Sequence, residues 1–318
     1  MNFNSGSLMQ TVLDHLSYQT VQPSEIIIVD NASTDDSVSE LDLSSLPQAR
    51  LVTLDHNIGF AGASNLAARQ TTCEWLAFLN PDTEPEADWI ENLSSAIRRY
   101  PDVKMFASAQ LSVANAKVLD GAGDCYFVLG FPWRGGLGRS VDELPREGEC
   151  FSPCGASALI SRQSFESVGG FDPSYFCYCE DVDLGFRLRL NGERCVFVPA
   201  AVVKHHGSAV TGRDSNFTIR LGTRNRLRTY LTNMPPVGLA MTLPWHILGT
   251  LYLCLRTIRK PYGLAFRQGL LEALRAHREI WSTRQKIQKS RILSSLEIMK
   301  AMSWNPVKLR LRKPHVWS

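Results

Sequence analysis

The stretch "FLNPDTEP", residues 78–85, leads from an apolar run straight into a rigid polar turn. Pro81 has a fixed φ angle and no amide proton, and it also restricts Asn80, so a strand that contains Phe78 must end at this point. Asp82 then follows between two prolines. We expect a rigid turn after the strand, which serves either as a simple turn or as a holder of the Asp82 carboxylate for a metal ion.

Two upstream segments are organised in the same way. In "EIIIVDNASTDDS" (25–37) an apolar run ends at Asp30, and the next expected strand is followed by a loop with Asn57 and then a helix. Strands that alternate with helices at this pace predict an α/β fold with an open, mostly parallel sheet flanked by helices. Ligands bind such sheets at the carboxyl ends of the strands, where we expect Asp30, Asn57 and Asp82.

Two segments depart from this regular pattern. The helix expected over 7–19 has no strand in front of it, so the first strand is missing from the sequence, and we expect the natural protein to begin upstream. The segment 127–150 is rich in Gly, Pro and aromatic residues, which predicts a mobile loop over a site rather than regular structure.

Three acidic residues lie close together at the start of a predicted helix. Glu180, Asp181 and Asp183 occupy the first turn of "EDVDLGFRLRLNG". The helix dipole favours acids at this end, so capping explains one of them. Three carboxylates within four residues repel one another unless a cation is near, and the cluster therefore favours a functional site.

The charge of the chain is distributed unevenly. The whole chain carries +3, whereas the segment from Arg256 to the end has 15 basic and 3 acidic residues, so it carries 15 − 3 = +12 and the remainder carries 3 − 12 = −9. Such a basic segment usually faces a membrane surface or nucleic acid, or it is a solvated helix. The aromatic residues typical of single-strand binders are sparse, so we expect no nucleic acid.

An uncharged stretch precedes the basic segment. Residues 237–255 contain no formal charge, but they are slightly short for a membrane span of about 20 residues, and Pro244 and His246 interrupt them. An interfacial or re-entrant helix fits better, and a helix of the core is the alternative. We therefore divide the chain into a catalytic domain, 1–233, and a helical membrane-associated segment, 234–318.

No signal peptide is visible and the eight cysteines form no disulfide framework, so we expect a cytoplasmic protein, peripheral at the inner face of the cell membrane.

Six motifs follow one another in the first 233 residues: "VDNASTDDS", "NIGFAGASN", "FLNPDTEP", "GGFDPSYFCYCEDVDLGFRLR", "VKHHGSAVTGR" and "RNRLRTYLTN". With them the chain resembles the glycosyltransferase family 2 enzymes of GT-A fold, especially the rhamnosyltransferase-like members that build bacterial surface polysaccharides. The resemblance implies inverting transfer of a sugar from a nucleotide-diphosphate sugar to a glycan or lipid-linked acceptor, with Mg²⁺ or Mn²⁺ as cofactor.

The resemblance also assigns roles to individual residues. Asp82 and His205 match metal ligands, although a histidine at the end of a strand can instead simply be satisfied by the backbone. Asp181 matches the catalytic base, with Glu180 and Asp183 orienting the acceptor or the start of the helix. The remaining matches are expected to contact the nucleotide: Phe3, Asp30, Asn31, Asn57, Gly59, Phe60, Asn65 and Arg224.

Two departures from the family leave alternatives open. Asn80 stands where many relatives carry an aspartate, and residues 2–6 preserve only the loop that follows the missing strand. An inactive, membrane-docked paralogue is therefore one alternative. A nucleotidyltransferase acting on sugar phosphates is the other, although the Gly-rich basic loop that those enzymes carry after the first strand is not seen.

Overall fold

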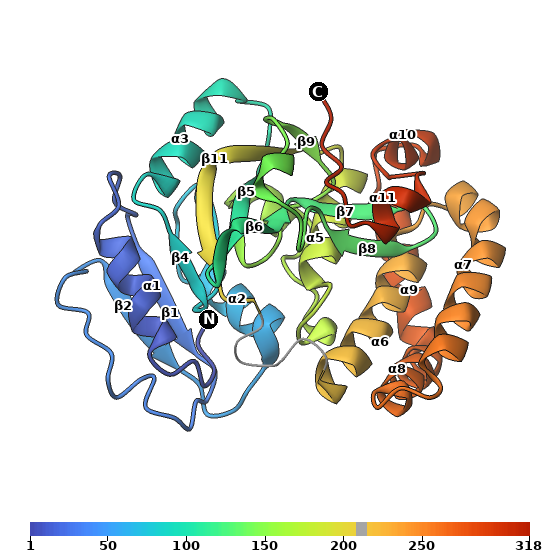
Figure 1. Ribbon diagram of the computed structural model, residues 1–318, viewed down its shortest axis with the longest axis horizontal. Helices are drawn as coiled ribbons and strands as arrows, with labels where there is room; N and C mark the ends of the chain where they lie inside the picture. The colour runs from blue at the N-terminus through green and yellow to red at the C-terminus, as the bar shows by residue number, and fades with distance from the viewer. Residues whose placement is uncertain (208–214) are drawn as a thin grey trace.

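The computed structural model describes residues 1–207 and 215–318, and a seven-stranded sheet forms its centre (Figure 1). The main path of this sheet runs β3–β10–β5–β11–β4, with β6 paired to β5 and β9 paired to β11. Its strands are β3 (Trp75–Leu79), β4 (Thr83–Pro85), β5 (Met105–Ser112), β6 (Asn115–Ala122), β9 (Gly148–Cys150), β10 (Ser157–Ser161) and β11 (Cys195–His205).

Helices cover both faces of this sheet because neighbouring strand residues point to opposite sides. On β5, Phe106 enters one core cluster, which α1 (Leu8–Ser17) and α3 (Trp89–Arg99) complete. Its neighbour Ala107 enters the other cluster. The helices that complete this second cluster are α2 (Gly59–Arg69), α4 (Arg162–Ser167) and α5 (Glu180–Leu190).

The α/β fold class is confirmed, but the expectation of mostly parallel strands is wrong. In the seven-stranded sheet β5 and β11 pair in parallel, whereas β10 is antiparallel to both β3 and β5, and β4, β6 and β9 also pair antiparallel. Helices bury the sheet on both faces, so every central strand has a continuous apolar run whatever its direction. Burial was therefore predictable from the sequence and strand direction was not.

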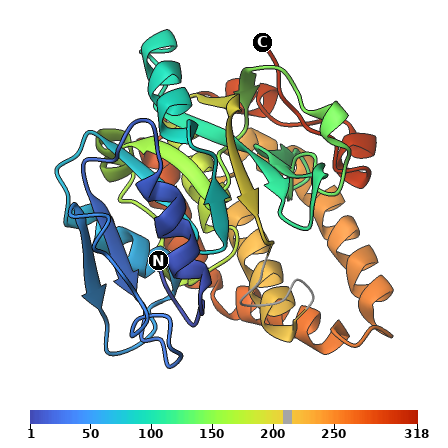
Figure 2. The ribbon, with the colours of Figure 1, turned by 60° about the vertical axis from the view of Figure 1, so that its left-hand side comes forward.

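The strands β1 (Ile26–Asp30) and β2 (Ala49–Thr53) form a separate parallel pair, visible beside α1 in Figure 2. A cavity of about 550 Å³, lined by apolar residues of β1, β3 and α1, lies between this pair and the main sheet. Asn2 forms a parallel bridge with Asp30 at one end of β1. The gap thus lies where the sequence predicted a missing strand.

The expectation of a mobile loop over 127–150 is wrong for much of that segment. It contains the hairpin of β7 (Asp124–Phe127) and β8 (Phe131–Arg134), a short 3-10 helix at Val141–Glu143, and β9. Aromatic side chains hold the hairpin: Tyr126 stacks on Phe151 in the core, and Trp133 Nε1 donates to the carbonyl oxygen of Lys313 at 3.0 Å. The aromatic residues that suggested a flexible loop are therefore core residues.

The C-terminal third of the chain is helical and returns to the sheet domain. Its helices are α6 (Asn216–Asn233), α7 (Pro236–Thr257), α8 (Gly263–Arg275), α9 (His277–Ser290), α10 (Ser295–Lys300) and α11 (Pro306–Arg310). Figure 1 shows α7 to α9 along one edge of the molecule. The backbone amide of Ser303 donates to the carbonyl oxygen of Tyr126 at 2.8 Å, and that of Trp317 donates to the carbonyl oxygen of Glu149 at 2.9 Å. The boundary at 233/234 stays a prediction.

The gap between β1 and β3 leads to a prediction about stability. Because Asn2 already pairs in parallel with Asp30, residues added before Met1 would run along β1, and five Val or Ile residues would fill the cavity. We expect the melting temperature to rise, by roughly 2–4 °C for each kcal/mol gained. Differential scanning calorimetry measures the change. A Gly-Ser extension of equal length is the control. The prediction would be contradicted if the apolar extension raised the melting temperature no more than the Gly-Ser extension does.

Candidate active site

A cavity of about 850 Å³ lies where several predicted site residues meet. Its walls come from the N-terminal loop, the start of α2, the turn after β3, the loop before α5, and the helices α6 to α8. Of the predicted residues, the following line it: Phe3, Asn57, Gly59, Phe60, Asp82, Glu180, Asp181 and His205.

Asp82 and His205 form one buried pair on the cavity wall. The turn after β3 carries Asp82, and β11 ends at His205, whose Nε2 lies 3.4 Å from Asp82 Oδ1. His205 Nδ1 donates to Asp120 Oδ2 at 2.5 Å, which directs the Nε2 lone pair at Asp82. Burial alone would lower the pKa of His205, but hydrogen bonds to Asp120 and then Asp82 raise it above its usual value. Nε2 and the carboxylate therefore require a proton or a cation between them.

This pair fits a divalent cation. Adjacent ligands of an octahedral ion at about 2.1 Å lie about 3 Å apart, close to the observed Nε2–Oδ1 separation. A carboxylate on the far nitrogen of a ligating histidine fixes its tautomer and orientation, and Asp120 occupies that position. Arg134 Nη1 in turn donates to Asp120 at 2.7 Å. Mg²⁺ or Mn²⁺ could therefore be bound by Asp82 and His205, with phosphate oxygens and water completing the shell.

Asp181 lies in the first turn of α5, directly after a strained loop. Phe176, Tyr178 and Cys179 all have positive φ angles, of 66°, 71° and 65°. Such strain persists only when the surroundings impose it. Here Asn225 Nδ2, from α6, lies within 2.9 Å of three carbonyl oxygens of residues 175–178. The loop is thereby held in the conformation that points Asp181 into the cavity.

The Asp181 carboxylate is oriented by two backbone amides. Gly155 N donates to Oδ2 and Val182 N donates to Oδ1, both at 2.8 Å. Each oxygen of the carboxylate has two lone pairs and accepts one hydrogen bond here, so each keeps a lone pair for a ligand. A carboxylate held in this way can accept a proton from a hydroxyl group in the cavity.

Other acidic groups surround Asp181. Burial and then the Asp181 charge raise the pKa of Glu180 well above its usual range, which favours the protonated form of its carboxyl group. Burial and then Asp181 likewise raise the pKa of Asp124, against the opposing effect of Arg134. Ligand atoms of Asp124, Cys154 and Asp181 lie within 4.8 Å of one another. The Arg134 guanidinium partly offsets the charge of this group, which makes it a poorer match for a cation than the pair of Asp82 and His205.

Gly59 is required by the close approach of two loops at the cavity. Its φ is +76°, and a Cβ there would lie 2.5 Å from the carbonyl oxygen of Phe176. The preceding Asn57 is held by Asn31, whose Nδ2 donates to Asn57 Oδ1 at 2.8 Å. Asn31 itself does not line the cavity, so it supports the wall from behind.

Three other predicted residues are not brought into the cavity. Asp30 accepts hydrogen bonds from Asn2 Nδ2 at 2.8 Å and from the Ser33 amide at 3.2 Å. Asn65 forms two bonds with the backbone of Phe171, which tie α2 to the turn before α5. Asp183 accepts from Arg187, Tyr175 and Asn233, so all of its oxygens are used. Each of these side chains stabilises the fold around the site.

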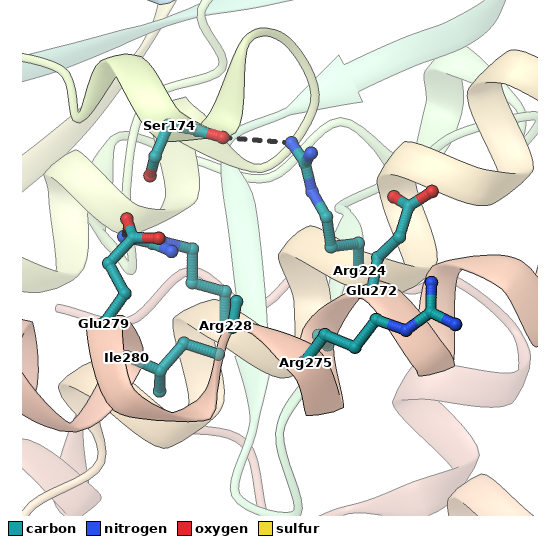
Figure 3. Close-up of a pocket in the computed structure, with 9 residues that line it drawn as sticks. Ser174, Arg224, Arg228, Glu272, Arg275, Glu279 and Ile280 are labelled. Atoms are coloured by element: carbon teal, nitrogen blue, oxygen red, sulfur yellow. Dashed lines mark hydrogen bonds and ion pairs between the residues drawn. The ribbon is translucent and has the colours of Figure 1, made fainter.

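Arg224 also lies outside the main cavity. Figure 3 shows it in a separate pocket of about 310 Å³ with Arg228, Arg275 and two glutamates, where its guanidinium reaches toward Ser174. Nη2 donates to the carbonyl oxygens of Ser174 and Tyr175 at 3.0 and 2.9 Å. The expected contact with a diphosphate in the main cavity is therefore not supported.

Sequence reasoning missed several residues of the site. Arg134 belongs to the segment 127–150 that was interpreted as a loop, and Asp124 lies three residues before that segment. Arg226 lies two residues beyond Arg224, the arginine that was chosen. Asn225 has no charge to attract notice. The only available signal for Asp124, Asn225 and Arg226 was the polar composition of the stretches "DGAGD" (120–124) and "RNR" (224–226). Residues 208–213, the end of the motif that contains His205, lie outside the described residues.

Comparison with known proteins identifies relatives with a shared reaction type. A model of glycosyl transferase family 2 matches residues 1–169. An N-acetylglucosaminyl-diphospho-decaprenol L-rhamnosyltransferase of Mycobacterium tuberculosis is 30% identical over 242 residues, covering 67% of this chain and 76% of that protein. Rhamnosyltransferase WbbL of Escherichia coli K12 is 30% identical over 165 residues, covering 46% of this chain and 61% of that one.

Solved structures share the fold at low identity. A mannosyltransferase, PcManGT of Pyrobaculum calidifontis, in complex with GDP-Man and Mn²⁺, has a TM-score of 0.52 at 18% identity and covers 96% of this chain and 84% of its own. GalNAc-T7 with UDP, GalNAc and Mn²⁺ has a TM-score of 0.56 at 16% identity, covering 71% and 45%. With more than half of its 318 residues matched by the family model, this GT-A-fold chain belongs to glycosyl transferase family 2, is similar to its rhamnosyltransferases, and is a glycosyltransferase that uses a nucleotide sugar.

Proposed function

We propose that this glycosyltransferase inverts the anomeric centre of the sugar that it transfers from a nucleoside diphosphate to a hydroxyl group of a lipid-linked or polysaccharide acceptor. Similarity to rhamnosyltransferases favours rhamnose as the sugar. The observation that carries the proposal is the position of Asp181, which faces the same cavity as Asp82 and His205. One group there accepts protons, and the other two suit a cation that binds phosphate.

Asp181 acts as the general base in this proposal. It takes the proton of the acceptor hydroxyl while that oxygen bonds to the anomeric carbon, and the bond from this carbon to the diphosphate breaks. The bonding electrons leave with the nucleoside diphosphate. Glu180 lines the cavity beside Asp181, and its buried Oε2 has no hydrogen-bond partner among the described residues, so it can help to position a ligand. A direct displacement of this kind inverts the configuration of the sugar.

Asp82 and His205 would hold Mg²⁺ or Mn²⁺, and the bound ion would supply positive charge to offset that of the leaving diphosphate. Asn80 also lines the cavity, at the place of a second acid in many relatives. One protein carboxylate is sufficient because such ions bind phosphate oxygens and water for most of their shell. Phe3, Asn57, Gly59 and Phe60 form the wall against which the nucleotide lies.

A lipid-linked acceptor places the reaction at a membrane surface. The relative from Mycobacterium tuberculosis is named for a decaprenol-linked substrate. We infer that this chain also works at the inner face of the cell membrane, as a peripheral protein whose C-terminal helices contact the lipid. The basic charge of those helices suits an anionic surface.

The role of Asp181 is tested by replacement with asparagine. We expect Asp181→Asn to lower the transfer rate by about 10²- to 10⁴-fold, because the amide cannot accept the proton. Calorimetry should show nucleotide-sugar binding within about threefold of wild type, since the effect on the transition state is separate from ground-state binding. Normal turnover in the variant would refute the assignment.

Asp183→Asn is the matched control two residues further along α5. We expect it to act on folding, because it leaves the buried Arg187 guanidinium without its carboxylate partner. Breaking a buried ion pair on one side costs about 3–5 kcal/mol, measured by chemical denaturation. If Asp183→Asn kept the free energy of unfolding of wild type but lost sugar transfer, Asp183 would have a role in the reaction itself.

The metal site is tested through Asp120, which positions His205. We expect Asp120→Asn to weaken binding of Mn²⁺ in the presence of nucleoside diphosphate by about 10- to 100-fold, because the imidazole loses its orientation. Isothermal titration calorimetry measures the affinity. Glu84→Gln, which removes the contact with the neighbouring His206, is the control. Equal Mn²⁺ affinity in the Asp120 variant would show that the cation binds elsewhere.

A further inference from the structure

The helix α7 has its apolar side facing outward. Its exposed large residues recur every three or four positions, as on one face of a helix: Val237, Met241, Trp245, Leu248, Tyr252 and Leu255. The residues buried against the protein are Gly238, Thr242 and His246. A helix on the surface of a protein in water normally has the opposite arrangement. An outward apolar face of this length indicates a contact surface.

Polar contacts fix this orientation of α7. His246 stacks on Tyr230 with ring centroids 3.9 Å apart, and its Nδ1 donates to the carbonyl oxygen of Leu129 at 2.7 Å. Thr242 is hydrogen-bonded to Tyr230 at 2.8 Å. Rotating α7 to bury its apolar face would break these hydrogen bonds. The contacts of His246 and Thr242 therefore keep the apolar face exposed.

The helices that follow also expose large apolar side chains. Leu264, Leu271, Leu274 and Trp281 are each half or more exposed. Basic side chains lie among them in the sequence: Arg256, Arg259, Lys260, Arg267, Arg275 and Arg278. Two acids of this stretch are engaged, Glu272 with Arg220 and Glu279 with Arg228. A second copy of this basic surface would repel the first, whereas an anionic lipid bilayer attracts it.

The contacts at both ends of α7 favour a helix that lies on a bilayer over one that crosses it. Within residues 1–207 and 215–318, α7 is the one helix long and apolar enough to span, and 17% of its most apolar window is buried. Both of its ends are tied to the same domain: Arg284 of α9 donates to the carbonyl of Met234, just before α7. After α7, Gly269 of α8 packs so closely on Arg220 of α6 that a Cβ would lie 2.3 Å from its carbonyl oxygen. A spanning helix would have to pull these contacts apart.

The surface helices also form one end of the main cavity. Leu253 and Thr257 from α7, with Tyr262 and Phe266 at the start of α8, line the same cavity as Asp181. The catalytic group and the bilayer-facing hairpin are thus connected by one continuous space, and its end at the hairpin is mainly apolar.

An unpaired cation lies between these two ends. Arg226 is 9% exposed and lines the cavity, and its Nη1 has no hydrogen-bond partner among the described residues. Its Nη2 lies 3.3 Å from Thr250 Oγ1 of α7, and its guanidinium covers the Phe131 ring at 4.6 Å. Burial lowers its pKa to about 10, so it is charged at neutral pH. A buried guanidinium with free donors requires an anion, and phosphate suits its geometry.

We propose that the α7–α8 hairpin rests on an anionic bilayer and that the cavity takes from it an acceptor whose sugar is joined to a lipid through phosphate, with Arg226 binding that phosphate. The sugar then lies at Asp181 and the lipid leaves past Leu253 and Phe266. The inference rests on the proposed function, since it names the acceptor of that reaction.

Vesicle binding tests the surface. We expect sedimentation with phosphatidylcholine vesicles to increase when about 30% phosphatidylglycerol is added, because the surface is basic. Trp245→Glu/Leu248→Glu should weaken this binding by at least about tenfold, because two charges would enter the interface. The matched control is Tyr18→Glu/Val21→Glu, which changes exposed apolar residues next to α1.

Three results would overturn the surface contact. These are equal vesicle binding by the two double variants, a dimer in lipid-free buffer that only the α7 variant dissociates, and vesicle binding that resists alkaline carbonate. The second result would identify a second copy as the partner. The third would identify a spanning helix.

Acceptor preference tests Arg226. Two soluble acceptors carry the same sugar on the same short alkyl chain, one joined through diphosphate and one as a neutral glycoside. We expect Arg226→Gln to reduce the ratio of kcat/KM for the diphosphate acceptor over the neutral one by about 10- to 100-fold, because the charged hydrogen bonds are lost. Arg226→Lys should recover part of the ratio. Arg224→Gln, two residues away and outside the cavity, should leave the ratio within about twofold.

The outcomes separate the two proposals. If wild type neither transfers to any acceptor nor hydrolyses any nucleotide sugar, the proposed function is wrong and the acceptor assignment fails with it. If wild type transfers and Arg226→Gln leaves the ratio unchanged, only the phosphate assignment is wrong. The vesicle result stands independently of both.

Discussion

The buried Asp183 carboxylate is the interaction on which the site depends. It accepts hydrogen bonds from Tyr175 before the strained loop, from Arg187 on α5, and from Asn233 at the end of α6. Three segments that are distant in the sequence are thereby fixed around one charge. Because Asp181 lies two residues before Asp183, its position relative to α6 follows from this network. A buried ion pair of this kind specifies an arrangement more than it adds stability.

Two of the predicted site residues that the structure brings together lie at strand ends. Pro81 fixes where β3 stops, so Asp82 had to follow it directly, and His205 ends the strand β11 that pairs with β4. Residues at the ends of paired strands are brought together by the sheet itself. The proximity of Asp82 and His205 could therefore be predicted from local signals, although Asp120, which orients the histidine, could not.

The predicted residues that lie outside the cavity make contacts that no local pattern encodes. Asn65 of α2 donates to the carbonyl oxygen of Phe171, 106 residues away, so its amide joins two elements of the fold. Helix phase explains the choice between Arg224 and Arg226. Residues two apart point to nearly opposite sides of a helix, and only the packing of α6 decides which side faces the cavity.

Asp181 and the outer helices are connected through α6. Asn225 holds the strained loop, and its neighbour Arg226 lies against α7, so adjacent residues of one helix serve both ends of the cavity. The C-terminal segment contacts the sheet domain through Ser303 and Trp317. Residues of α7 and α8 also form part of the cavity wall.

The gap beside β1 has a consequence for the behaviour of the protein in concentrated solution. Backbone amides and carbonyls along the facing edges of β1 and β3 border an apolar cavity. Such edges are templates for strands from other molecules. An extended apolar peptide that meets this gap could pair with one edge and bury its side chains at once. Strand exchange between molecules can begin at such an edge, and a strand that occupied the gap would cover both edges.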